Sequence, residues 1–535
     1  MPMSSFLSMR PLRGALLSLS LLALAPAAGA APKSLEPRGL AEKHTGRELA
    51  ANTYVERIVV KFHEGSRVRL RDNRLVPIAS ERGEAERSLL AGRGLSDASV
   101  RADATAVESL LQRAPRLGAP TRLFDEAEPV LEARKATGEA RSGQQLADLN
   151  LYFEVPLLPG TTAGGVADLV AELNRLDGVE VAYAEPPPEP AMVNFGMDAA
   201  LRSLLAAADI PPTTPLYQGN QGYLKVAPGG VDANYAWTVT GGTGTNVKVV
   251  DIEGGWRTTH EDMPAMFYTG GTQYADLAWR NHGTAVLGEI ASVSNAYGTT
   301  GIAHAARVGI EGVASQSTAS AISKAATAAG LGGIILIELH AGGPSDGTAC
   351  TCNTSQCNYI AMEYWTANYD AIRTATANGV IVVEAAGNGS ANLDAAAYGN
   401  AFNRSVRESG AIIVGASTAT TRVPMCWTNY GSRVDVHGWG EQVYSLGYGN
   451  VFGSANGEDQ YYTSTFSGTS SASPIIVGAA ASAQGVALAN GRRLTSIQMR
   501  GLLRNNGTAQ AASSQQIGPL PDLRKALPKV ISGQY

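Results

Sequence analysis

The chain has 535 residues, of which 44% are apolar and 17% are charged, and its formal net charge is −5 at pH 7. This length exceeds one ordinary domain, so we expect two, each with a sizeable core. The slightly acidic balance provides no basic surface of the kind that binds nucleic acids or anionic membranes, so neither is expected as a partner.

The first 30 residues have the pattern of a secretory signal peptide. Arg10 and Arg13 precede an apolar stretch at 15–24, and small residues follow at 28–30 (AGA). A short membrane anchor is the alternative, but the apolar stretch is too brief to span a bilayer. The mature protein is therefore expected to be secreted, to the periplasm or the medium.

Residues 31–190 predict a small α/β domain that is rich in Arg and Glu. Alternating or β-rich stretches at 56–62 (ERIVVKF), 149–156 (LNLYFEVP) and 179–184 predict strands, and helical spacing at 167–176 (ADLVAELNRL) predicts a helix. A charged, largely helical insertion at about 64–147 separates the first strand from the second.

A proline-rich breaker ends this domain. Prolines stand at 186, 187, 188 and 190, and more Pro and Gly follow up to residue 230. Such a stretch is stiff and extended. Because exposed linkers are where proteolytic nicking concentrates, residues 191–230 are the expected processing region.

Residues 231–535 predict a doubly wound parallel sheet. Nearly continuous apolar runs occur at 246–250 (NVKVV), 334–339 (IILIEL), 380–383 (VIVV) and 411–414 (AIIV), and helical segments such as 317–329 and 364–378 lie between them. Strands buried on both faces have this composition. Sites in such sheets gather at the carboxyl ends of the strands.

The four cysteines are Cys350, Cys352, Cys357 and Cys426. Cys350 and Cys352 are too close in sequence to pair without strain, so each is expected to bond one of the other two. Buried free thiols are the alternative.

Four residues have the side chains and the positions for acyl transfer. Asp251 follows the first apolar run, Asn388 follows the third, and His282 and Ser470 each stand at the start of a predicted helix. Ser470 would be the nucleophile, His282 its base and Asp251 the carboxylate that orients the imidazole. The Asn388 amide and the Ser470 N–H would stabilise the oxyanion.

Each of these residues alone has a simpler structural explanation, as a turn residue, a helix cap or a structural histidine. The order Asp, His, Ser is the one found in subtilisin. In addition, HGTAVLG at 282–288, VVEAAGNG at 382–389 and GTSSASP at 468–474 resemble signatures of subtilisin-like serine peptidases.

The resemblance extends over about 231–530 and implies a subtilisin-like endopeptidase fold and activity on protein or peptide substrates. It also implies that the front domain is an inhibitory propeptide, although an unrelated adaptor domain is the alternative. His340, Ala341 and Gly342 would pair with substrate backbone. Ala385, Ala386 and Gly387 would line the opposite wall of the specificity pocket. No cofactor is required, and calcium, with Asn392 and Asp394 as oxygen donors, would serve only stability.

The sequence also departs from the family pattern. Ser or Thr and then Gly usually follow the catalytic Asp, whereas Ile252 and Glu253 follow Asp251 here. Together with Glu338 and Glu384, Glu253 could form a group of carboxylates that share protons or bind a basic side chain. Separate, solvated or capped glutamates are the alternative.

Two other functions remain open at this stage. An inactive member would keep the fold as a binding or inhibitory module, and a peptide ligase or esterase would use the same triad. All four catalytic residue types are present, which counts against the inactive module.

Overall fold

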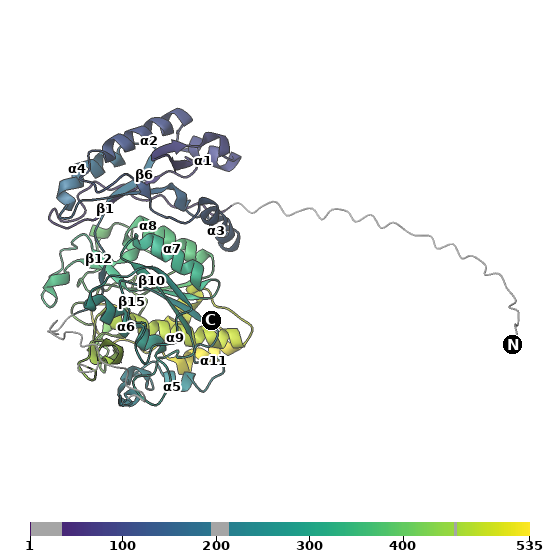
Figure 1. The fold of residues 1–535 in the computed structure, drawn as a ribbon, viewed down its shortest axis with the longest axis vertical. Coiled ribbons are helices and arrows are strands. Elements are labelled where there is room, and N and C mark those ends of the chain that lie inside the picture. The colour runs from purple at the N-terminus through teal and green to yellow at the C-terminus, as the bar shows by residue number, and fades with distance from the viewer. Residues whose placement is uncertain (2–34, 194–212, 454–456) are drawn as a thin grey trace.

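The computed structural model describes residue 1 and residues 35–193, 213–453 and 457–535. It contains a smaller N-terminal unit stacked on a larger C-terminal unit (Figure 1). Apart from Met1, the predicted signal peptide lies outside the described residues, as does the middle of the predicted linker at 191–230.

The N-terminal unit is a four-stranded sheet, in the order β4-β5-β1-β6, with helices packed against it. β1 lies between β5 and β6 and is antiparallel to both. Its elements are β1 (Arg57–Phe62), β2 (Val68–Arg71), β3 (Arg74–Pro77), α1 (Glu84–Gly92), α2 (Asp97–Leu111), β4 (Thr121–Arg122), α3 (Glu128–Ser142), β5 (Tyr152–Pro156), α4 (Ala163–Asn174) and β6 (Val179–Glu185).

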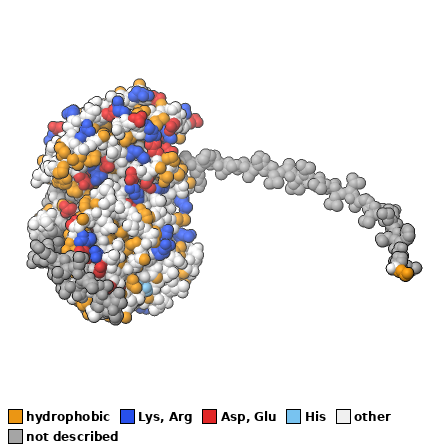
Figure 2. Space-filling view, viewed as in Figure 1, with side chains coloured by type: hydrophobic (Ala, Val, Ile, Leu, Met, Phe, Trp, Pro, Cys, Tyr) orange, Lys and Arg blue, Asp and Glu red, His pale blue; other side chains and the backbone are white. Residues whose placement is uncertain are grey.

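The three strands predicted in this unit are confirmed, and the predicted helix is also present, although it begins earlier, at Ala163. The insertion is largely helical, as expected, but β2 and β3 form a hairpin within it that the sequence did not predict. This hairpin was missed because each of its strands, VRLR and RLVP, is only four residues long, which is too short to stand out from the surrounding polar sequence. Figure 2 shows charged side chains gathered mainly over this unit.

The C-terminal unit is built on a seven-stranded parallel sheet in the order β16-β15-β14-β11-β8-β10-β9. These strands are β8 (Lys248–Glu253), β9 (Tyr268–Thr272), β10 (Arg307–Val313), β11 (Ile334–Ile337), β14 (Ile381–Ala385), β15 (Ile412–Ser417) and β16 (Val436–Trp439). After β8, the chain adds β9 and β10 on one side of it and then β11, β14, β15 and β16 on the other side. The sheet is therefore doubly wound, as predicted.

Helices cover both faces of this sheet. α6, α9 and α11 share one apolar core, while α7 and α8 pack on the other face. The helices are α5 (Ala233–Ala236), α6 (Leu277–Ala291), α7 (Thr318–Ala329), α8 (Thr366–Ala377), α9 (Thr469–Ala489), α10 (Ser496–Asn505) and α11 (Leu523–Ser532), and shorter strands are β7 (Glu189–Pro190), β12 (Leu339–Gly342), β13 (Tyr359–Ala361), β17 (Val443–Leu446) and β18 (Tyr462–Phe466). α9 is long and apolar enough to cross a membrane, but 89% of that stretch is buried inside the fold, as in a core helix.

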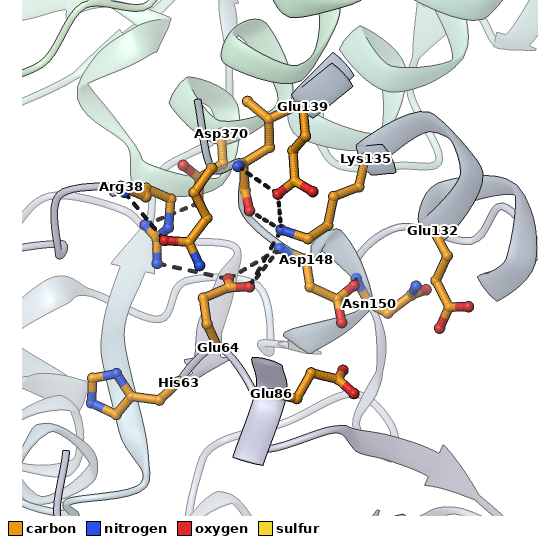
Figure 3. Close-up of polar contacts among 12 residues, drawn as sticks. Arg38, His63, Glu64, Glu86, Glu132, Lys135, Glu139, Asp148, Asn150 and Asp370 are labelled. Atoms are coloured by element: carbon orange, nitrogen blue, oxygen red, sulfur yellow. Dashed lines mark hydrogen bonds and ion pairs between the residues drawn. The ribbon is translucent and has the colours of Figure 1, made fainter. Parts of the chain in front are cut away.

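The two units share an apolar core and a buried polar network. One face of the N-terminal sheet, including Val59 and Tyr183, packs on α7 and α8. Beside it, the Tyr152 hydroxyl donates to Asp370 of α8 at 2.6 Å. The Arg38 guanidinium lies between Asp370 of α8 and two glutamates of the N-terminal unit, Glu64 and Glu180, with Glu180 at 2.5 Å. Figure 3 shows Arg38 together with Asp370 and Glu64. The contact between the units therefore combines apolar packing with paired buried charges.

Both disulfides agree with the cysteine prediction. Cys350 bonds Cys357, and Cys352 bonds Cys426. Among the described residues no free cysteine is left.

Candidate active site

The site lies where the carboxyl end of β8 meets α6 and the first turn of α9. Asp251 and Glu253 are on β8, His282 is on α6, and Ser470 is the second residue of α9. All four side chains are fully buried. Two local expectations were wrong: β8 continues to Glu253 rather than ending before Asp251, and α6 begins five residues before His282.

His282 contacts Glu253 and not Asp251. The Nδ1 atom of His282 lies 2.5 Å from Oε2 of Glu253. Asp251 instead accepts a hydrogen bond from Nε1 of Trp256 at 2.8 Å, and its other oxygen has no partner among the described residues. The prediction that Asp251 orients the imidazole is therefore wrong, and Glu253 occupies that position.

A strand's period of two explains why the sequence left this choice open. Asp251 and Glu253 are two residues apart on β8, so both side chains project from the same face of the sheet. Glu253 ends the strand, and the Gly254 N–H donates to its Oε1 at 2.9 Å. The available signal was the run Glu253-Gly254-Gly255, in which a small residue and a Gly follow the acid as the family pattern requires.

Burial strongly perturbs the acid and the base. It raises the pKa of Glu253 well above its usual range, against the hydrogen bond from Gly254. Burial also lowers the pKa of His282 to about 3. The 2.5 Å contact leaves room for one proton between Nδ1 and Oε2. With that proton on Nδ1 the imidazole is neutral, and its Nε2 is free to accept a proton.

The predicted oxyanion residues meet at the N-terminus of α9. The Asn388 carbonyl oxygen accepts from the Thr469 N–H at 3.0 Å and from its hydroxyl at 2.8 Å. These two donors fix which way the amide faces, so its NH₂ group points elsewhere, at 3.3 Å from Oε1 of Gln356. The Ser470 N–H is at the positive end of the helix dipole.

The chain's own residues 189–193 lie across this site. The Ser470 N–H donates to the Ala191 carbonyl oxygen at 3.1 Å, and the Ser467 hydroxyl donates to the Val193 carbonyl at 2.6 Å. Gly468, at φ +112°, makes this approach possible, because a Cβ there would lie 2.4 Å from the Ala191 oxygen. Ser470 Oγ and His282 Nε2 are buried without a hydrogen-bond partner among the described residues.

The segment His340–Gly342 forms most of β12, and β12 receives an added strand. β7 pairs antiparallel with it, with His340 opposite Glu189. On the far side of β12, Tyr359 of β13 donates its hydroxyl to the Glu189 carboxylate at 2.7 Å. Tyr359 was not among the predicted contact residues, because nothing in its local sequence distinguishes it.

Ala385 is the last residue of β14, which lies next to β11, and Ala386 and Gly387 follow it. The Asn429 side chain joins this segment to β13, because its NH₂ group donates to the carbonyls of Ala386 at 2.6 Å and Tyr359 at 2.7 Å. Gly387 has φ +94° and would collide with Asn429 if it carried a Cβ. Small residues are therefore required on this wall.

The three glutamates do not form one group. Glu338 lies near Asp251 and Glu253, whereas Glu384 neighbours Glu363 and Arg433 in a separate buried network. None of the three is solvated, since each side chain is fully buried.

The residues considered for calcium do not present a free set of oxygens. Both Asp394 carboxylate oxygens accept hydrogen bonds from Ser432, and the Asn392 carbonyl oxygen accepts from the Asp394 N–H. Within the described ranges no cluster of three or more His, Cys, Asp or Glu side chains could hold a metal ion.

Solved structures of proteases are similar to this chain. A protease from Pseudoalteromonas arctica PAMC 21717 is 21% identical, with 60% of this chain and 99% of that chain covered and a TM-score of 0.43. Fervidolysin from Fervidobacterium pennivorans, a keratinolytic enzyme related to subtilisin, is 15% identical, with 93% and 63% covered and a TM-score of 0.50. A cold-adapted subtilisin-like serine proteinase is 23% identical, with 52% and 89% covered and a TM-score of 0.36.

Of these, fervidolysin, with a TM-score of 0.50, supports the fold alone. No curated protein matches the chain. The sequence comparison with protein families is more specific. The model of the subtilase family, peptidase family S8, matches residues 243–519, which is more than half of the chain and includes Glu253, His282, Asn388 and Ser470. The chain therefore belongs to the subtilase family of serine-type peptidases.

Proposed function

We propose that the chain is the precursor of a secreted serine endopeptidase that cuts itself between Ala191 and Met192. Residues 31–191 would be the inhibitory propeptide, and the catalytic part would begin at Met192. Hydrolysis would proceed through an acyl-enzyme on Ser470, with protein or peptide substrates and the propeptide as partners.

One observation carries this proposal: the Ala191 carbonyl accepts a hydrogen bond from the Ser470 N–H at 3.1 Å. A carbonyl that is to be attacked must be within reach of both the nucleophile and an oxyanion donor. The preceding residues pair with β12 as a substrate strand would. The chain thus supplies its own first substrate.

The chemistry follows from these positions. Ser470 Oγ attacks the Ala191 carbonyl carbon while His282 Nε2 takes the hydroxyl proton. His282 then gives that proton to the Met192 nitrogen as the Ala191–Met192 bond breaks. Water, deprotonated by the same imidazole, releases Ala191 from Ser470 as a carboxylate.

Glu253 is the acid of this triad in our proposal. Its carboxylate would hold the Nδ1–H tautomer and stabilise the imidazolium that forms during the attack. The oxyanion would accept hydrogen bonds from the Ser470 N–H and from the Asn388 NH₂ group. The Asn388 NH₂ group now donates to Gln356 at 3.3 Å, a long and weak hydrogen bond that it would give up for the oxyanion.

Secretion is supported by the predicted signal peptide and by the two disulfides, which persist in oxidising compartments. Inhibition by the N-terminal part is supported by its shared core with α7 and α8 and by the buried Arg38–Asp370 contact. After cleavage, these contacts would hold the propeptide in place until it is degraded.

The cleavage point can be tested with Met192→Pro and Met192→Ala in the full-length chain. Proline makes the scissile bond a tertiary amide and removes the N–H that donates to Pro190 at 2.8 Å. We expect no cut at this bond in Met192→Pro, whereas Met192→Ala should release a fragment that begins at residue 192. Mass spectrometry of the new N-terminus distinguishes these results. Cleavage elsewhere in the wild type would refute this cleavage point.

Self-cleavage of the precursor should continue at lower pH than peptide hydrolysis by the mature enzyme. The base works only when it is neutral, so activity is present above the His282 pKa and is lost as pH falls through it. Burial lowers that pKa to about 3 in the uncut chain, and departure of residues 189–193 would expose the imidazole and return its pKa toward about 6.5. Between these values the first cut should continue while peptide hydrolysis in trans declines. Gel time courses and peptide assays of one preparation at several pH values would show whether the two profiles separate.

A further inference from the structure

Four buried carboxyl groups, one of them the triad acid Glu253, gather at the active site without a Lys or Arg partner among the described residues. They belong to Asp251 and Glu253 of β8, Glu289 of α6, and Glu338, which directly follows β11. Each is fully buried, and in the part of the chain described here none forms an ion pair with Lys or Arg. A buried carboxylate without a cation is costly, so most of these groups must hold a proton.

Glu338 is in direct contact with the helix that carries the nucleophile. Its Oε2 lies 2.6 Å from the hydroxyl of Ser473. Ser473 stands three residues after Ser470 on α9, on the same side of the helix. The Ser470 hydroxyl also lies close enough to favour the charged form of Glu338, although it makes no hydrogen bond in this state.

Proton counting at Ser473 indicates which form Glu338 takes. The Ser473 hydroxyl lies 2.6 Å from Glu338 Oε2 and 2.8 Å from the Thr469 carbonyl oxygen, and it has one proton. A carbonyl can only accept, so Ser473 donates to Thr469. The contact with Glu338 is then a hydrogen bond only if the carboxyl group donates it. Both contacts are satisfied when Glu338 is protonated.

We infer that Glu338 is a positioning residue of the acyl-transfer site and that it acts in its protonated form. Its O–H donates to Ser473, which donates to Thr469, and this relay holds the first turn of α9 and with it the Ser470 hydroxyl and N–H. This inference rests on the proposed peptidase activity. It gives a role to a buried acid that the triad and the oxyanion hole do not use.

The surroundings of Glu338 keep it neutral. Burial is the main influence that raises its pKa well above the usual range, and the carboxyls of Asp251 and Glu253 raise it further when they are ionised. A hydrogen bond donated by Ser473 to an ionised Glu338 would lower it. Titratable groups on the elements around it are Asp251 and Glu253 on β8, His282 and Glu289 on α6, His340 on β12, and Glu384 on β14. Glu384 neighbours Arg433 instead.

Ionisation of Glu338 should therefore impair catalysis. An ionised Glu338 could no longer donate a hydrogen bond to Ser473. It would also place a negative charge near Ser470 Oγ, where the negatively charged oxyanion forms during the reaction. The activity needs the protonated acid, so it is present below the Glu338 pKa and lost as pH rises through it. We expect a loss of about tenfold or more across this alkaline limb.

The test compares pH profiles of kcat/KM for the self-processed wild type, Glu338→Gln and Glu384→Gln. The amide introduced by Glu338→Gln still donates to Ser473 but cannot ionise, so this variant should match the wild type near neutral pH and keep its activity at alkaline pH. Glu384→Gln removes a buried carboxyl from the other network and should retain the wild-type alkaline limb. Superimposable profiles of the wild type and Glu338→Gln would overturn the inference.

A second readout does not depend on activity. In full-length Ser470→Ala, infrared spectra should contain the carbonyl stretch of a protonated carboxyl group that disappears when Glu338→Gln is added. An unchanged spectrum would contradict a protonated Glu338 even if the variants fold poorly. Conversely, absence of peptide hydrolysis in the wild type, with this band present, would count against the peptidase proposal and not against the protonation of Glu338.

Discussion

Glu253→Gln is expected to lower kcat/KM about 10⁴-fold, the size of effect seen when the acid of a serine-peptidase triad loses its charge. The amide keeps the length of the side chain but cannot fix the Nδ1–H tautomer or stabilise the imidazolium. Because Oε2 of Glu253 lies 2.5 Å from His282 Nδ1, no other described group can replace it without rearrangement. Steady-state peptide hydrolysis, with active sites counted by a serine-directed phosphonate, measures this loss.

Asp251→Asn is the matched control. The carbonyl of the introduced amide can still accept from Trp256 Nε1. In the wild type, burial and then the charge of Glu253 raise the pKa of the Asp251 carboxyl well above its usual range, so an uncharged side chain is tolerated at this position. We expect a change of less than about tenfold. If Asp251→Asn caused the large loss of activity and Glu253→Gln the small one, Asp251 would be the acid of the triad. The contact between Glu253 and His282 would then not describe the active enzyme.

Ser470→Ala is expected to abolish both processing and hydrolysis. Loss of the nucleophile costs subtilisin about 10⁶-fold in kcat, and the oxyanion hole alone supplies the small remaining acceleration. The full-length chain should therefore persist uncut after export. Gel mobility, intact mass and casein digestion measure the three consequences.

Ser471→Ala provides the comparison for Ser470→Ala. Ser471 is the next residue, equally buried, and its hydroxyl donates to the Trp439 carbonyl at 2.8 Å. Its removal should cost stability but leave processing intact. If Ser470→Ala were still processed at residue 192 in a host that lacks other peptidases, the nucleophile would have to be sought elsewhere. If neither protein were cut or active, an inactive subtilase fold that acts as a binding module would become the better hypothesis.

Local sequence was sufficient for most of the architecture. The apolar runs at 246–250, 334–339, 380–383 and 411–414 predicted strands that the structure contains as β8, β11, β14 and β15. Burial on both faces leaves this composition in any parallel strand, whatever its partners are. Short motifs likewise predicted His282, Asn388 and Ser470 as site residues, since a motif is a local property. The structure places Asn388 just after β14, Ser470 in the first turn of α9 and His282 in the second turn of α6.

Tertiary structure decided which carboxyl contacts the imidazole, what fills the cleft and where Glu338 lies, although the run Glu253-Gly254-Gly255 already gave a sequence signal for the first. Asp251 and Glu253 share one face of β8, so the position of α6 along that strand decides which of them meets His282. The Ala191–Ser470 and Glu338–Ser473 contacts join residues that lie far apart in the sequence. Sequence periodicity determines which way a side chain points from its own strand or helix, but the packing of whole elements determines what it meets.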